Sequence, residues 1–125
     1  MDKIVTIYVA ITILVFFLLR LKYRSLVKKA PAITIDKIRD LKDSREVRFI
    51  DVRSYREIEA QPVVQCEKIA HNLINTIEGD KNQKIILFCN SGIRASFAAE
   101  VLIKKKFKNV YYFSGDMMLL KSISL

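Results

Sequence analysis

The sequence predicts an α/β domain with a mainly parallel central sheet flanked by helices, preceded by one transmembrane helix. An uncharged apolar run occupies residues 4–19, and after it strand-like and helix-like patterns alternate at short intervals. Such alternation is typical of folds that pack helices against a parallel sheet. The length of 125 residues accommodates one domain of this kind together with an appendage.

The composition excludes several classes of protein. With 51% hydrophobic and 28% charged residues, the chain is too apolar to be disordered. Its two cysteines and one histidine are too few for a disulfide scaffold or for a structural zinc site with four soft ligands. We therefore expect neither a metal nor another cofactor.

Residues 4–19 are expected to form a single transmembrane helix. At about 1.5 Å per residue the run is near the lower limit for crossing a hydrocarbon core of roughly 30 Å, and flanking side chains can extend it by snorkelling. The alternatives are a cleaved signal peptide and a buried core helix. Both fit less well, because the basic residues follow the apolar run instead of preceding it and because the run has no polar face.

Much of the net charge of +9 lies just after this run. Residues 20–30 contain five basic side chains and no acidic one, namely Arg20, Lys22, Arg24, Lys28 and Lys29. A basic flank stays on the cytoplasmic side of a bilayer, so we expect the N-terminus outside and the remaining chain in the cytoplasm. The chain is thus divided into a membrane anchor with its basic flank (1–24), a juxtamembrane linker (25–33) and a folded domain (34–125).

The first elements of the domain follow from caps and periodicity. Thr34 can cap a short helix over residues 35–41, whose apolar side chains share one face. Residues 47–52 have the composition of a strand, and a short helical turn is expected over residues 55–60. Residues 66–78 leave two alternatives open, which are a helix or a short strand at residues 69–71 that leads into a helix.

The clearest pattern lies in the second half of the chain. Residues 84–92 form an apolar run that ends abruptly in a polar turn containing glycine, as expected of a buried parallel strand. Residues 95–106 predict a helix whose small side chains can pack closely on a sheet, and residues 109–113 predict a last strand.

A candidate site lies where the buried strand ends. Cys89 closes that strand, and the turn to the next helix consists of Asn90, Ser91, Gly92, Ile93 and Arg94. Backbone N–H groups of such a turn, together with the helix N-terminus, favour a thiolate without help from a histidine base. Arg94 would add a cation or bind an anionic substrate. Taken alone, however, Cys89 fits better as an ordinary buried thiol, because buried cysteines at strand ends are common.

The residues of this turn, read with two other motifs, resemble a known family. The string CNSGIRAS from Cys89 onward resembles the active-site loop of the rhodanese-like sulfurtransferases. Asp51-Val52-Arg53 with Glu57 four residues later is similar to the Asp-Val-Arg signature of that family, and residues 107–111 (FKNVY) match its approach to the last strand. The resemblance covers about residues 33–116.

The resemblance implies a rhodanese fold and a role for each motif residue. Cys89 would take a sulfane sulfur from a small anionic donor, become a persulfide and pass the sulfur to a thiol or another nucleophile. The backbone of residues 90–94 would bind the persulfide and Arg94 would stabilise the anion, while Asp51, Arg53 and Glu57 would be structural. The six-residue loop has the size associated with sulfur transfer, since related phosphatase-type loops are one residue longer.

Two other functions also fit the sequence. One is a catalytically silent rhodanese-like module that holds a partner at the membrane, and the other is a redox sensor that pairs Cys89 with Cys66. Asn90 stands where thiosulfate-using relatives often carry a basic residue, which predicts that thiosulfate is a poor donor. The lysines of residues 104–108 end a helix without base-stacking aromatic residues, so we expect no nucleic-acid partner, although these lysines suit anionic lipid.

Overall fold

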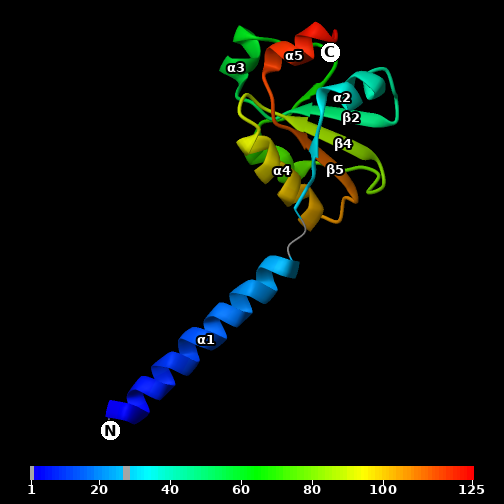
Figure 1. The fold of residues 1–125 in the computed structure, drawn as a ribbon. Coiled ribbons are helices and arrows are strands. Elements are labelled where there is room, and N and C mark those ends of the chain that lie inside the picture. The colour runs from blue at the N-terminus through cyan, green and yellow to red at the C-terminus, as the bar shows by residue number, and fades with distance from the viewer. Residues whose placement is uncertain (1, 27–28) are drawn as a thin grey trace.

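A computed structural model describes residues 2–26 and 29–125 (Figure 1). Helix α1 (Asp2–Leu26) lies apart from the α/β domain and is long and apolar enough to cross a membrane, with none of its apolar span buried. The hydroxyls of Thr6 and Thr12 donate hydrogen bonds to carbonyls one turn earlier, so no polar face interrupts the helix. Residues 27–28 of the predicted linker and Lys28 of the basic stretch lie outside the described residues.

The domain is built on a parallel sheet with the strand order β1-β5-β4-β2-β3. Its strands are β1 (Ala32–Ile33), β2 (Val47–Asp51), β3 (Glu67–Lys68), β4 (Lys84–Phe88) and β5 (Asn109–Phe113). All the strand pairs are parallel, as the alternation of strand and helix patterns predicted. The buried middle strand β4 is the apolar run that the sequence singled out.

Helices cover both faces of the sheet. They are α2 (Ile35–Leu41), α3 (Tyr55–Ala60), the 3₁₀ helix η1 (His71–Thr76), α4 (Ile93–Lys104) and α5 (Met117–Ser122). Side chains of β4 alternate between two cores. Ile85 and Leu87 pack with α4 and η1, whereas Ile86 and Phe88 pack with α2 and α5. The alanines of α4 are buried, so this helix lies close to the sheet.

The structure settles the open alternative and adds two elements that the sequence did not predict. Residues 66–78 form a short strand and a 3₁₀ helix. The strand lies at Glu67–Lys68 instead of the expected residues 69–71, and hydrogen bonds from Ile69 N–H and His71 N–H to β2 and the residue after it continue its pairing. Strand β1 lies within the stretch predicted as a linker, and it exists because it pairs with the end of β5. Helix α5 was also not predicted.

The register of the sheet decides where the functional residues meet. Asp51 and Phe88 are partners at the carboxyl ends of β2 and β4, and Val52 N–H donates to the carbonyl of Phe88 at 3.0 Å. The Asp-Val-Arg motif and the Cys89 loop therefore leave the sheet side by side. Ligand sites of parallel α/β sheets lie at this end of the strands.

Candidate active site

The Cys89 thiol lies at the start of helix α4, completely buried. Its Sγ accepts hydrogen bonds from the backbone N–H of Gly92 at 3.1 Å and from that of Ala95 at 3.4 Å. Both donors belong to the N-terminal end of a helix, where unpaired N–H groups and the helix dipole attract negative charge. The arrangement can therefore hold a thiolate, or an anionic sulfur attached to it.

Gly92 makes this turn possible. It caps α4 in the left-handed conformation with a φ of +79°, which L side chains rarely adopt. A Cβ at this position would lie 2.8 Å from the hydroxyl oxygen of Ser114 and 2.9 Å from its Cα. Ser114, the residue after β5, thus closes one side of the loop, and only glycine fits beside it at position 92.

A half-exposed ion pair joins the loop to helix α3. Arg94 donates to both carboxylate oxygens of Glu57, with Nη1–Oε1 at 2.7 Å and Nη2–Oε2 at 2.6 Å. Asn90 Nδ2 donates to Oε2 at 2.6 Å, and the Ser54 hydroxyl donates to Oε1 at 3.0 Å. The hydrogen bonds from Arg94 are the main reason why the pKa of Glu57 falls to about 2. Glu57 is therefore ionised and raises the pKa of Arg94 in turn.

A second ion pair, completely buried, supports the first. Arg53 Nη2 lies 2.7 Å from Asp51 Oδ2, and the same carboxylate accepts the backbone N–H of Arg53 at 3.0 Å. The guanidinium also donates to the carbonyls of Gln61 at 2.7 Å and of Glu57 at 3.4 Å, at the end of α3. Arg53 therefore fixes the helix that presents the Glu57 carboxylate to the loop.

The residues singled out in the sequence take different positions in this loop. Cys89, Gly92 and Arg94 converge as described, whereas the Asn90 side chain turns to Glu57. Ser91 is exposed and its hydroxyl accepts the Ile93 N–H at 3.4 Å, while the Ile93 side chain is exposed.

Two contacts were not expected from the sequence. Glu57 was expected to be structural near the site, and the contacts that its carboxylate makes with Arg94 and Asn90 of the loop were not foreseen. The Ala95 N–H was missed because any residue supplies this donor, so no sequence signal exists for it.

Cys66 lies in different surroundings from Cys89. It packs with the core on the α2 and α5 face of the sheet, whereas Cys89 belongs to the core on the α4 face. Its Sγ–H donates to the carbonyl of Val63 at 3.0 Å, and burial raises the pKa of this thiol to about 12. Cys66 is therefore a neutral thiol and is poorly placed for a disulfide with Cys89.

No metal centre accompanies the site in the described part of the chain. Within residues 2–26 and 29–125, no three His, Cys, Asp or Glu side chains gather around a point that could hold an ion. His71 is exposed, and its backbone N–H pairs with the carbonyl of Val52.

Several solved structures share this fold. A single-domain sulfurtransferase of Saccharomyces cerevisiae has a TM-score of 0.64 at 18% identity, covering 77% of this chain and 92% of its own. A human single-domain sulfurtransferase has a TM-score of 0.66 at 18% identity, covering 74% and 96%. A rhodanese of E. coli, solved with anions, has a TM-score of 0.51 at 25% identity, covering 55% and 86%.

Similar curated sequences include tRNA uridine(34) hydroxylases, which are longer proteins. Those of Sodalis glossinidius and Yersinia pestis are 26% and 23% identical over alignments of 91 positions that cover 66% of this chain. The chain spans only about a quarter of the length of these relatives, 26% in both cases. Residues 34–122 match the family described as the rhodanese-like domain, a match that includes the Asp-Val-Arg motif and the whole Cys89 loop. The chain belongs to the rhodanese-like domain family.

Proposed function

We propose that this protein is a sulfurtransferase that carries a sulfane sulfur on Cys89 as a persulfide. The observation that carries the proposal is the pair of backbone N–H groups, from Gly92 and Ala95, that point at Sγ from 3.1 and 3.4 Å. Such donors stabilise a thiolate before the reaction and can follow the negative charge to the terminal sulfur of a persulfide after it. An inert buried thiol does not require them.

The proposed reaction has two displacement steps. The Cys89 thiol loses its proton to solvent, and the thiolate attacks the outer sulfur of a small anionic donor. The donor's sulfur–sulfur bond breaks and the leaving group departs with the electron pair, as sulfite from thiosulfate or as a thiolate from a persulfide. An acceptor thiolate then attacks the terminal sulfur of the Cys89 persulfide, which releases the Cys89 thiolate and forms a new persulfide.

The loop residues have distinct parts in this proposal. The backbone of Asn90, Ser91, Gly92, Ile93 and Arg94 surrounds the transferred sulfur, and Arg94 stabilises the anion. Because Cys89 has no exposed surface, a donor can reach Sγ only after side chains at the site have moved. The Arg94–Glu57 pair is the candidate for this movement, since both side chains keep about 30% of their surface exposed, 29% and 30% respectively.

We further propose that helix α1 anchors the domain in a lipid bilayer as a single span, with the N-terminus outside and the domain in the cytoplasm. The support is the uncharged span and the basic residues that follow it, Arg20, Lys22 and Arg24. The test is resistance of the full chain to carbonate extraction from membranes. Orientation is read by protease treatment of sealed vesicles whose cytoplasmic face points outward. The domain should be digested in the intact vesicles if it is cytoplasmic, and only after their lysis if it is not.

Sulfur transfer is tested by intact mass on the full chain in detergent, beside its Cys89→Ser and Cys66→Ser variants. Each protein is treated with thiosulfate or with a low-molecular-weight persulfide. We expect the wild type and Cys66→Ser to gain the mass of one sulfur atom from the persulfide and to lose it on addition of cyanide or thiol. Cys89→Ser should gain nothing.

A folded wild type that stays unmodified with both donors would contradict the transferase proposal. That result would favour a catalytically silent module that holds a partner at the membrane, a function that the complete burial of Cys89 would also suit.

A further inference from the structure

A group of lysines lies at one end of the domain, outside the candidate active site. It comprises Lys81, Lys104, Lys106 and Lys108, which we call the lysine base. Lys104 ends helix α4, and Lys106 and Lys108 follow it before β5. Lys81 joins them from another loop, because the backbone N–H of Lys108 donates to the Lys81 carbonyl at 2.9 Å.

Three of the four ammonium groups of the lysine base are not used by the fold, whereas Lys81 Nζ lies 3.8 Å from the centroid of the buried Phe107 ring. Lys104, Lys106 and Lys108 are exposed, and in the described ranges 2–26 and 29–125 none of their side chains makes an ion pair or hydrogen bond. Lys105 is different, because its Nζ donates to the carbonyls of Asn75 at 2.6 Å and Ile77 at 2.7 Å. Lys105 is thus a structural lysine, whereas the charges of Lys104, Lys106 and Lys108 are free to interact with a ligand.

The topology puts the lysine base at the end of the domain where the chain arrives from α1. Helix α4 runs back along the parallel sheet, so its last turn lies at the amino ends of the strands, beside the chain that leads into β1 (Figure 1). Ala30, just before β1, is buried in the same core as Leu102 and Phe107. The buried Ala30 therefore holds this end of the domain to the connecting chain.

The connection to α1 is short. Four residue steps separate Leu26, the end of α1, from the buried Ala30, and four steps of fully extended chain reach at most about 14 Å. If α1 spans a bilayer, its basic end with Arg20, Lys22 and Arg24 lies among the lipid headgroups. A tether of this length allows the lysine base to approach the bilayer surface to within the roughly 8 Å over which electrostatic attraction acts at physiological ionic strength.

We propose that the lysine base binds the headgroups of anionic lipids and forms a second membrane contact beside the α1 anchor. The inference rests on the anchoring proposed above. The unpaired ammonium groups of Lys104, Lys106 and Lys108 complement phosphate-bearing headgroups, and the short tether keeps these lysines at a high local concentration near the bilayer. Because Cys89 lies at the opposite, carboxyl end of β4, this contact turns the site towards the water, from which donor and acceptor would then arrive.

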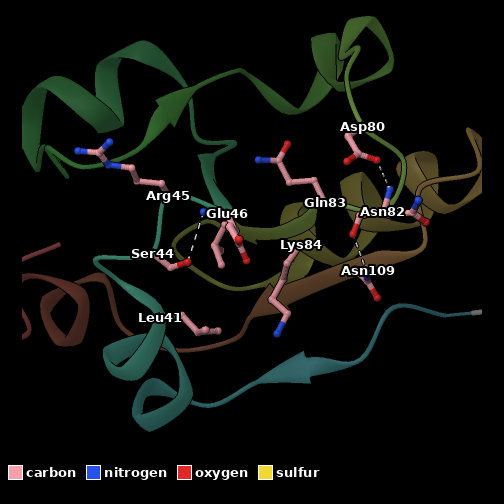
Figure 2. Close-up of a pocket in the computed structure, with 10 residues that line it drawn as sticks. Leu41, Ser44, Arg45, Glu46, Asp80, Asn82, Gln83, Lys84 and Asn109 are labelled. Atoms are coloured by element: carbon pink, nitrogen blue, oxygen red, sulfur yellow. Dashed lines mark hydrogen bonds between the residues drawn. The ribbon is translucent and has the colours of Figure 1, made fainter.

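A neighbouring hollow is not the lipid site. It lies at the amino ends of β2, β4 and β5 and has a volume of about 670 Å³ (Figure 2). Its two cations, Arg45 and Lys84, are balanced by Glu46 and Asp80. The hollow therefore has no excess of positive charge to attract an anionic headgroup, in contrast to the lysine base.

The test measures how fast each lysine of the full chain is acylated in lipid nanodiscs. Discs of phosphatidylcholine alone are compared with discs that also contain phosphatidylglycerol, a neutral reagent is used, and rates are read by peptide mass spectrometry. We expect Lys104, Lys106 and Lys108 to react about fivefold more slowly in the anionic discs. This factor corresponds to the attraction of about 1 kcal/mol that an anionic surface exerts on one lysine. High salt should abolish the difference.

Internal controls come from the opposite end of the domain. Lys37 lies in the first turn of α2 and Lys121 lies in α5. Both are exposed, and their rates should not depend on the lipid. In the double variant Lys104→Glu/Lys108→Glu the remaining Lys106 should lose its lipid dependence. In the matched variant Lys37→Glu/Lys121→Glu, the acylation rate of Lys106 should still depend on the lipid.

Equal rates for the lysine base in both kinds of disc would overturn the proposal, provided that the protein stays in the discs. Protection of these lysines by added RNA, without protection by anionic lipid, would overturn it in favour of a nucleic-acid site. Failure of the anchor is a separate result, since the chain would then elute without the discs.

Discussion

Two arginine–carboxylate pairs lie side by side in this domain, with similar geometry and very different surroundings. Asp51 and Arg53 are 2.7 Å apart and both side chains have 0% exposure. Glu57 and Arg94 are 2.6 Å apart, but 30% and 29% of their surfaces remain exposed. The first pair joins β2 to the end of α3, and the second joins α3 to the Cys89 loop.

The difference shows that burial, more than contact distance, decides which of the two pairs can open. A buried charge cannot lose its partner without a large desolvation penalty, so the Asp51–Arg53 pair is effectively permanent. A partly exposed pair contributes about 0–1 kcal/mol and can open, because water replaces the lost contacts. In the proposed reaction, Arg94 can therefore exchange Glu57 for a donor anion, whereas Arg53 cannot leave Asp51.

The largest effect is expected from breaking the buried pair. Asp51→Asn leaves the Arg53 guanidinium buried without its counter-charge, which should cost about 3–5 kcal/mol in the free energy of unfolding. Thermal unfolding should show a Tm lowered by more than about 10 °C. The matched control is Asp36→Asn in the exposed Asp36–Arg39 pair, which should stay within about 0.5 kcal/mol of wild type. Equal effects of the two changes would contradict the distinction by burial.

The next effect should come from the turn that holds the thiol. Gly92→Ala forces a Cβ to within 2.8 Å of the Ser114 hydroxyl at a φ of +79°, so the N–H donors must shift away from Sγ. Misplacement of about 1 Å at a reacting group can cost a factor of about a hundred, which is the loss we expect in the rate of Cys89 persulfidation. Ser91→Ala is the control, since that side chain is exposed, and its rate should stay near wild type.

The exposed pair is expected to govern the choice of donor. Glu57 neutralises the only cation of the loop, so a dianion such as thiosulfate must compete with a carboxylate for Arg94. Glu57→Gln should lower the KM for thiosulfate roughly fivefold, equivalent to about 1 kcal/mol, with less effect on a singly charged persulfide. Steady-state kinetics with both donors provides the measurement. A rise in the KM for thiosulfate would show that Glu57 helps anion binding instead of opposing it.

The same variant should have a small effect on stability that depends on pH. The pKa of Glu57 is lowered to about 2 in the folded protein from an ordinary 4.5, so its stabilising effect is complete above that ordinary value. The effect is lost as the pH falls from about 4.5 to about 2. We expect Glu57→Gln to be destabilised by less than about 1 kcal/mol at pH 7, and the difference in urea midpoints to disappear in that acidic range. A difference that grows on acidification would contradict this assignment.

The two pairs also show how far the sequence alone could lead. Motifs made of residues that are neighbours in the sequence can be predicted from it. This holds for Asp51 with Arg53 and for Cys89 with its loop. The partner of Arg94 was not predicted, because Glu57 precedes it by 37 residues and only the sheet register brings α3 to the loop. Strand β1 was also not predicted, because a strand of two residues has no periodicity of its own and is defined only by its pairing with the distant β5.

The smallest effect is expected at the second cysteine. Cys66 is half-buried on the opposite face of the sheet from Cys89, and a pKa of about 12 leaves it almost without thiolate at neutral pH. Cys66→Ser should therefore change the rate of Cys89 persulfidation by less than about twofold, because thiolate character governs thiol reactivity. Thiol alkylation followed by mass spectrometry should find both cysteines free after oxidation of the persulfide-free protein. A Cys66–Cys89 disulfide in the folded chain would require the two faces of the sheet to rearrange, and its detection would favour a redox sensor over a sulfurtransferase.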